Sequence, residues 1–198
     1  MTPEKFAVFY FIMTMCFSPG PNNILSTAHA TKYGYKKTLP LLLGMVAGFT
    51  TLGSIIAVAA DWLSAYKKIF DILVSVGAVY IFYLGWKIAF SSPLNEEDVH
   101  EDKPLGFKTG ALLQLVNGKA WFHFLTLMTT VVKPLDLSLT GKLITNFVNS
   151  FFGMCAISTW ALAGTVLRKI FSNPKQTRIL NGALGLSLAI LAVWLVFS

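Results

Sequence analysis

The stretch "SPGPNN" at residues 18–23 interrupts an apolar run that is otherwise typical of a helix in lipid. The residues before it, "FAVFYFIMTMCF" (6–17), are almost all apolar. A proline has no backbone N–H, and its ring clashes with the carbonyl four residues earlier, so Pro19 and Pro21 each release one carbonyl. In lipid, irregular backbone persists only where protein or a water-filled cavity satisfies such groups. The stretch therefore predicts a break in a membrane helix, which is either a purely structural kink or part of a polar site.

The composition indicates a membrane protein. Of the 198 residues, 55% are hydrophobic and only 13% are charged, whereas soluble domains carry about 25% charged residues. The formal net charge is +7. We attribute this excess to basic connectors on one side of a bilayer rather than to a nucleic-acid surface, and we expect the lipid bilayer, not nucleic acid, as a partner.

Six stretches are long and apolar enough to cross the hydrocarbon core, which takes roughly 20 residues per helix. The first, third and fifth connectors hold roughly twice as many Lys and Arg residues as the N-terminus and the other connectors, and basic residues concentrate on the cytoplasmic side. We therefore expect both termini outside the cytoplasm. The predicted spans are 5–27, 38–60, 69–90, 107–132, 143–167 and 179–197.

A second interruption follows half a chain later. The apolar stretch "LGFKTGALLQLV" (105–116) leads into "NGKAW" (117–121) and then a further apolar run. By the distribution of basic residues, this span enters from the opposite face, so the two breaks meet near the middle of the bilayer. Paired broken helices in an inverted repeat are typical of secondary transporters that bind substrate at the repeat interface. The expected fold is an all-α membrane domain, 1–198, with three-helix halves 1–92 and 105–198 and a charged cytoplasmic linker 93–104.

The first break predicts a site for an anion. Pro21 suits the first turn of a new helix, and the N–H groups that follow it are unpaired at the positive end of the helix dipole. A substrate carboxylate fits that position, while the amides of Asn22 and Asn23 add neutral donors and acceptors. Gly20 is expected to loosen the backbone between Pro19 and Pro21.

Polar residues of the fourth span extend the predicted site. An ionisable side chain at membrane depth is a functional candidate, so Lys119 is expected to hold a substrate carboxylate or neutralise a neighbouring group. The alternative is that Lys119 begins a helix and snorkels to water. Gln114 and Asn117 belong to the same patch. His123 follows Lys119 by one turn and is either a proton relay or a packed, hydrogen-bonded histidine.

Other polar residues in the spans have different expected roles. Asp61, beside Trp62 at the outer end of the second span, is either an interfacial anchor or a second proton-coupling candidate. Asn146, Asn149 and Gly153 share a face of the fifth span, where we expect helix contact rather than substrate contact.

Two further patterns bear on assembly and chemistry. Gly44 and Gly48 form a GxxxG pair suited to close helix packing, either within the fold or between two copies in a homodimer. Cys16 and Cys155 both lie in apolar runs, so a disulfide framework is not expected. We find neither metal-ligand spacing nor a catalytic cluster in the sequence, and we predict no metal, no cofactor and no enzymatic activity.

Several of these stretches resemble a known family. They are "SPGPNN" (18–23), "GYKKTLPLLLGMVAG" (34–48), "YLGWKIAFSS" (83–92) and "NGKAW" (117–121). In order and spacing they resemble the lysine-exporter superfamily, specifically its homoserine/threonine-exporter branch of the RhtB/LysE type, across essentially the whole chain. Most members carry a proline where this chain has Gly118. Because glycine keeps its N–H, we expect a softer break there.

The departure at Gly118, together with "ALLQLVN" (111–117) and "WALAG" (160–164), looks most like the cysteine/O-acetylserine exporters. The resemblance implies export of small amino acids across the bacterial inner membrane, in exchange for protons. By the motif match, it also implies a transport core formed by Pro19, Gly20, Pro21, Asn22, Asn117 and Lys119.

We therefore expect a secondary transporter, an antiporter, for the efflux of small amino acids of the cysteine/O-acetylserine or threonine/homoserine type. Two alternatives stay open from the sequence. A channel or passive facilitator would use the same broken helices without coupling to a gradient, and a membrane assembly protein would have no permeant at all.

Overall fold

Five of the six predicted spans fall on residues that the structure describes, and these spans are helical apart from the breaks. The computed structural model describes residues 2–63, 79, 82, 83, 86, 89, 90, 103–170 and 173–197. The third predicted span, 69–90, and the linker, 93–104, lie outside the described residues except at these few positions. The helices are α1 (Pro3–Phe17), α2 (Pro21–Tyr33), α3 (Tyr35–Leu63), α5 (Phe107–Leu113), the 3₁₀ turn η2 (Gln114–Val116), α6 (Gly118–Thr126), the π-helical turn η3 (Leu127–Val131), the 3₁₀ turn η4 (Lys133–Leu135), α7 (Leu139–Ile170) and α8 (Pro174–Phe197).

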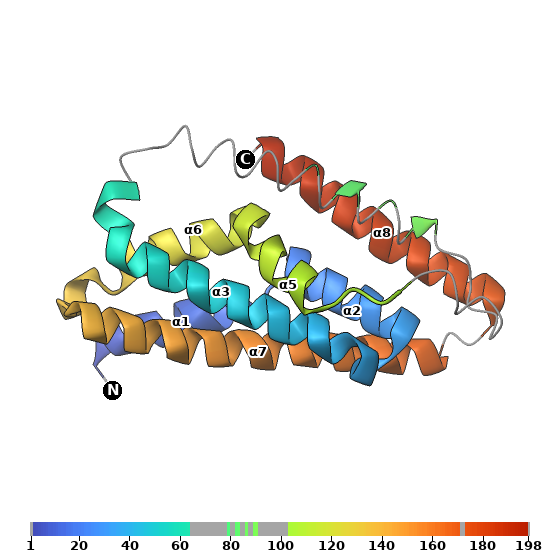
Figure 1. Ribbon diagram of the computed structural model, residues 1–198, viewed down its shortest axis with the longest axis horizontal. Coiled ribbons are helices and arrows are strands. Elements are labelled where there is room, and N and C mark those ends of the chain that lie inside the picture. Colours follow the sequence, from blue (N-terminus) through green and yellow to red (C-terminus); the bar gives the residue numbers. More distant parts are fainter. Residues whose placement is uncertain are drawn as a thin grey trace.

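The predicted break in the first span is confirmed. Helix α1 ends at Phe17, and the chain is extended at Ser18 (φ −63°, ψ 148°) and Gly20 (φ −172°, ψ 173°) before α2 begins at Pro21. Pro21 takes the first helical position, where a missing N–H costs nothing. The two helices follow one another along the long axis of the molecule (Figure 1).

The fourth span is also broken, although it has no proline at the break. Helix α5 tightens into η2, Asn117 leaves the helical region (φ −88°, ψ 94°), and α6 starts at Gly118. The Asn117 side chain accepts the Ala120 N–H and caps the new helix. At this break only Asn117 lies outside a helix, whereas three residues do so at the first break. The shorter interruption fits the softer break expected of glycine. The pair α5–α6 runs in the opposite direction to α1–α2 (Figure 1).

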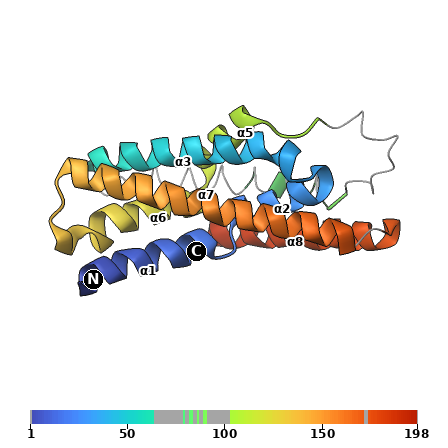
Figure 2. The same cartoon turned by 90° about the horizontal axis from the view of Figure 1, so that it is seen from below.

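Helix α7 holds the broken helices together. It lies along α1 and α2 on one side and packs against α3 on the other, as Figures 1 and 2 both show. Helix α3 in turn packs along α5. Helix α8 lies on the outside and contacts α2. The two breaks are therefore enclosed by α3 and α7, which supply the remaining walls of the space between them.

The GxxxG pair of the second span packs within the fold. A Cβ atom at Gly44 would overlap the Phe107 carbonyl, and one at Gly48 would overlap the Ala111 carbonyl. Gly110 of α5 meets α3 in the same way. These glycines allow α3 and α5 to approach backbone to backbone. The pair thus serves contact inside one chain, and the homodimer stays a prediction.

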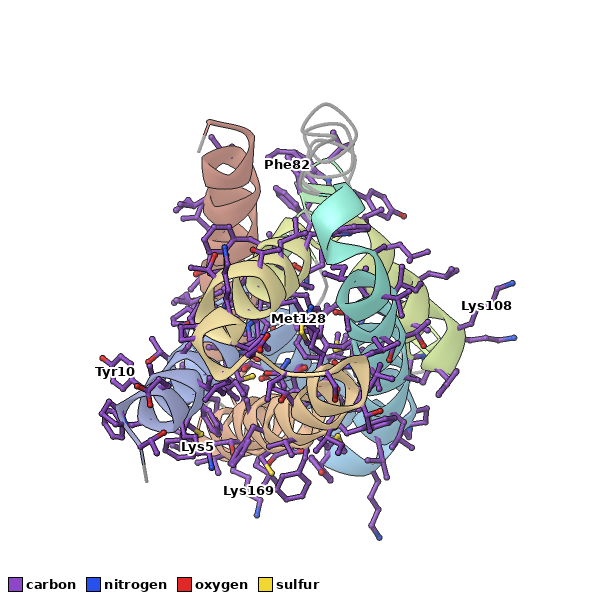
Figure 3. All side chains as sticks on the ribbon, turned by 90° about the vertical axis from the view of Figure 1, so that its left-hand side faces the viewer. Lys5, Tyr10, Phe82, Lys108, Met128 and Lys169 are labelled. Atoms are coloured by element: carbon purple, nitrogen blue, oxygen red, sulfur yellow. The ribbon has the colours of Figure 1, made fainter. Side chains whose placement is uncertain are left out.

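Polar and apolar side chains are distributed as in a membrane protein. Asn146 and Asn149 of α7 are fully buried, whereas Phe147 and Phe151 of the same helix are exposed. Figure 3 shows Lys108 pointing away from the bundle and Met128 inside it. Large exposed apolar faces of this kind are rare on soluble monomers. Among the described residues, the helical segments Tyr35–Ala59 and Leu139–Leu167 are long and apolar enough to cross a membrane.

Candidate functional site

A cavity of about 60 Å³ lies where the two breaks meet. By volume it has room for about four water molecules. Both breaks, α3 and α7 contribute to it. The lining residues are Met15, Cys16, Gly20, Pro21, Asn22, Asn23, Met45, Val46, Phe49, Asn117, Lys119, Ala120, His123, Gly153 and Ile157.

The carbonyls freed at the first break all find donors, and most of these donors are side chains. Asn23 Nδ2 donates to the Cys16 and Ser18 carbonyls at 2.8 and 2.9 Å. Trp160 Nε1 of α7 donates to the Phe17 carbonyl at 3.2 Å, the group that Pro21 leaves without a helical partner. Buried carbonyls without a donor are costly, so this network explains how a break survives in an apolar bundle.

Three amide side chains tie the two breaks to each other. Asn22 Nδ2 donates to Gln114 Oε1 at 2.9 Å, and Gln114 Nε2 returns a bond to Asn22 Oδ1 at 3.2 Å. Asn117 Nδ2 donates to the same Asn22 oxygen at 3.2 Å. The structure thus brings together residues of the two breaks that lie about 90 positions apart in the sequence. Of the three, Asn22 and Asn117 line the cavity, and Gln114 is fully buried behind them.

Lys119 bridges the breaks with its ammonium group. Nζ donates to the Ser18 carbonyl and hydroxyl, both at 2.9 Å, and to the Pro19 carbonyl at 3.2 Å. All three of its donors are therefore used, and they meet the carboxyl end of α1, where the helix dipole favours a cation. The side chain also lines the cavity, so its charge lies beside any molecule bound there.

Gly20 has a different role from the one expected. Its backbone is extended, with φ −172°, a conformation open to any residue. A Cβ atom at this position would lie 2.8 Å from Lys119 Cδ and 2.9 Å from Nζ. Backbone freedom therefore does not require glycine here, whereas a Cβ atom would force the end of the Lys119 side chain to shift.

The start of α2 presents unused donors to the cavity. Gly20 provides no side-chain cap, Pro21 has no N–H, and the first helical bond runs from the Ile24 N–H to the Gly20 carbonyl at 2.9 Å. Within the described part of the chain, the N–H groups of Asn22 and Asn23 have no acceptor, and Asn23 Oδ1 receives no hydrogen bond. This end of the cavity combines two N–H donors, a helix dipole and a nearby ammonium, a combination suited to an anion.

His123 faces the cavity from α6 but is almost fully buried. Its Nε2 lies 3.0 Å from Asn149 Oδ1 and donates to it. The ring is packed between Phe11 and Phe49, with centroids 5.3 and 5.6 Å away. Asn149 Oδ1 also accepts the Cys16 thiol at 3.6 Å. The described contacts suit a packed, hydrogen-bonded histidine, while the relay stays a prediction.

Pro19 and Asn146 are not among the described residues that line the cavity. Pro19 does not line it, and only its carbonyl takes part, through Lys119. Asp61 belongs to the last turn of α3, and its side chain lies outside the described residues. Asn146 donates to the Thr50 carbonyl of α3 at 2.9 Å, as expected for a helix contact.

Sequence reasoning missed the cavity wall that α3 and α7 supply. Met45, Val46 and Phe49 of α3 and Gly153 and Ile157 of α7 all line the cavity. For Gly153 the expectation was helix contact, and the structure places it at the cavity instead. The i, i+4 spacing of Gly153 and Ile157 marks a common face, yet the sequence does not state what that face contacts.

Comparisons with known proteins show what the whole chain is similar to. The family model described as a LysE type translocator matches residues 13–198. A protein of Salmonella paratyphi A named cysteine/O-acetylserine efflux protein is 34% identical over 98% of both chains. A protein of Escherichia coli O1:K1 with the same name is 32% identical over the same share. No solved structure matches this chain significantly. The chain belongs to the LysE-type translocator family, whose relatives named here are amino-acid efflux proteins.

Proposed function

We propose that this protein is a secondary transporter that exports small amino acids of the cysteine/O-acetylserine type from the cytoplasm, coupled to protons. The observation that carries the proposal is the cavity between two oppositely directed broken helices. Helix ends at such a point offer polar backbone to a substrate inside an otherwise apolar bundle. The names of the relatives supply the substrate class, and threonine or homoserine is the second candidate.

The proposed architecture is a six-helix inverted repeat in the bacterial inner membrane, with both termini outside. The opposite directions of α1–α2 and α5–α6 support it, as does the bias of basic residues toward the odd connectors. In this scheme residues 1–92 and 105–198 form the halves, and 93–104 forms the cytoplasmic linker. The halves rock about the cavity, and Asn22, Gln114 and Asn117 form the contact that must rearrange.

The proposed binding mode follows from the charges around the cavity. The substrate carboxylate lies at the start of α2, where it accepts from the Asn22 and Asn23 N–H groups close to the Lys119 ammonium. The substrate ammonium lies near Asn23 Oδ1, an oxygen that receives no hydrogen bond from the described residues. One site would thus offer hydrogen-bond donors to the carboxylate of an amino acid and an acceptor to its ammonium group. His123 and Asp61 are the candidates for proton coupling.

The test is transport by the purified protein in liposomes under an imposed proton gradient. Cysteine, O-acetylserine, threonine, homoserine, leucine and lysine are measured one at a time. We expect uphill flux of cysteine and O-acetylserine that collapses when the gradient is removed with a protonophore.

Asn22→Ala is the matched variant, because it removes the amide that connects Gln114 with Asn117. We expect its flux to fall at least about 10-fold, since three hydrogen bonds worth about 1 kcal/mol each are lost. Gln176→Ala, at an exposed amide residue of α8 outside the cavity, is the control. Downhill flux that does not respond to the proton gradient would show that the protein is a passive facilitator rather than a coupled transporter. No flux of any substrate would favour an assembly protein.

A further inference from the structure

The cavity has two unlike walls. The polar wall comes from the helix breaks, with Asn22, Asn23 and Lys119. A second wall comes from α3 and α7 and is apolar, with Val46, Phe49 and Ile157 as members, and Met45 adds a polarisable thioether. A bound amino acid that places its charged groups at the breaks would direct its side chain toward the apolar wall.

Gly153 of α7 belongs to this apolar wall and differs from the glycines that serve helix packing. At those positions a Cβ atom would overlap a neighbouring backbone or side chain. They are Gly44, Gly48, Gly53, Gly110 and Gly164. At Gly153 the nearest atoms to an added Cβ are Phe49 Cε1 at 3.6 Å and Cδ1 at 3.8 Å, which is ordinary van der Waals contact.

Packing therefore does not require a glycine at residue 153. Glycine is also a poor choice for the middle of a long helix, because its backbone loses more freedom on folding than that of alanine. Gly153 lies one helical turn after Asn149 and one turn before Ile157. Both of these residues are buried in the bundle. What the missing side chain does provide is open space at the cavity.

We propose that Gly153, together with Phe49 and Ile157, forms the subsite for the substrate side chain and sets the longest side chain that the transporter accepts. This inference rests on the proposed function. A short side chain such as that of cysteine would leave room beside Gly153, whereas the acetyl ester of O-acetylserine would extend into it. The subsite holds an uncharged group, because among the described residues its wall presents carbon and no charged side chain.

The experiment compares Gly153→Ala with Gly182→Ala in liposomes, measuring flux of cysteine and of O-acetylserine for each. Gly182 of α8 is the matched control, since a Cβ there meets no atom of the described residues within 4 Å. One methylene group more or less in an apolar pocket changes substrate discrimination by about 10-fold or more. We expect Gly153→Ala to lower O-acetylserine flux relative to cysteine flux by that factor, and Gly182→Ala to leave the ratio unchanged. Gly153→Val should extend the loss to cysteine.

The melting temperature of each purified variant separates the possible failures. Alanine fits the space and favours helix, so Gly153→Ala should melt no lower than the wild type. An unchanged flux ratio in a folded Gly153→Ala protein overturns the subsite while leaving the transporter intact. Equal loss of both substrates with a lower melting temperature also overturns it, because the glycine is then structural. If the wild-type protein transports neither substrate, the proposed function is wrong, and the subsite proposal fails with it.

Discussion

Replacing Lys119 with methionine should reduce transport far more than it reduces stability. Methionine keeps an unbranched side chain of similar length but removes the ammonium and its three hydrogen bonds to Ser18 and Pro19. If the positive charge beside the cavity helps to bind a carboxylate, flux should fall steeply. If it only closes the first break, the protein should lose stability instead.

The cost to stability can be worked out from the three acceptors. The Ser18 carbonyl keeps the bond from Asn23 Nδ2 at 2.9 Å, and the Ser18 hydroxyl keeps its own bond to the Met15 carbonyl at 3.2 Å. Only the Pro19 carbonyl loses its donor, and Pro19 is exposed. An orphaned carbonyl costs about 1–3 kcal/mol when buried, so the lower end applies here. A loss of about 1 kcal/mol lowers the melting temperature by about 2–4 °C in a chain of this size.

The expected effect on transport is larger. The three Lys119 donors are used within the protein, so its charge would act on a carboxylate through space; unit charges about 4 Å apart attract by about 1 kcal/mol in water and about 4 kcal/mol near a protein surface. A loss in transport efficiency of about 10- to 100-fold, equivalent to about 1.4–2.8 kcal/mol, is therefore expected. The assay measures initial efflux of cysteine from liposomes over a range of internal concentrations, beside thermal unfolding of the same preparation. Lys108→Met is the control, because Lys108 points away from the bundle (Figure 3).

Two results would refute this reasoning. Wild-type flux in Lys119→Met would mean that the ammonium has no part in binding and that the lysine merely closes the end of α1. A fall in melting temperature well beyond 4 °C, with flux reduced only by the loss of folded protein, would mean that the lysine is chiefly structural.

Further predictions concern helix packing and coupling. Gly164→Ala should destabilise the protein by about 1–3 kcal/mol, because a Cβ there overlaps the Thr27 carbonyl of α2 and forces α7 away; thermal unfolding measures this, and an unchanged melting temperature contradicts it. His123→Gln should abolish proton-driven flux while preserving substrate exchange without a gradient, because glutamine can donate a hydrogen bond but cannot carry a proton. Loss of exchange as well would make His123 a structural residue.

The sequence located both helix breaks because their causes are local. A proline lacks its N–H wherever it is placed, so Pro19 and Pro21 predicted the first break without any knowledge of neighbours. At the second break the signal was weaker, since Gly118 has an N–H. The break there still forms, because Asn117 leaves the helix and caps α6. Local chain chemistry thus settled where the helices stop.

The partners of individual side chains were not available from the sequence. Asn23 was expected to add a donor and an acceptor to the site, and the structure shows that its Nδ2 donates to the Cys16 and Ser18 carbonyls, partners that the sequence did not indicate. Trp160, which drew no attention as a site residue, supplies the donor for the Phe17 carbonyl across 143 positions of sequence. A single sequence does not reveal such pairs, since they depend on how α7 is rotated against α1 and α2.

The sequence by itself therefore determined that this chain is helical, apolar enough for a membrane, and broken at two polar points, because composition and missing N–H groups act on the nearest residues. The tertiary structure decided that the two breaks meet and that Lys119 joins them. It also decided that Gly153 borders the cavity while Gly44 and Gly48 lie in a helix contact. All three glycines look alike in the sequence. Only the packing of distant helices determines whether the space beside each is filled by backbone or left open.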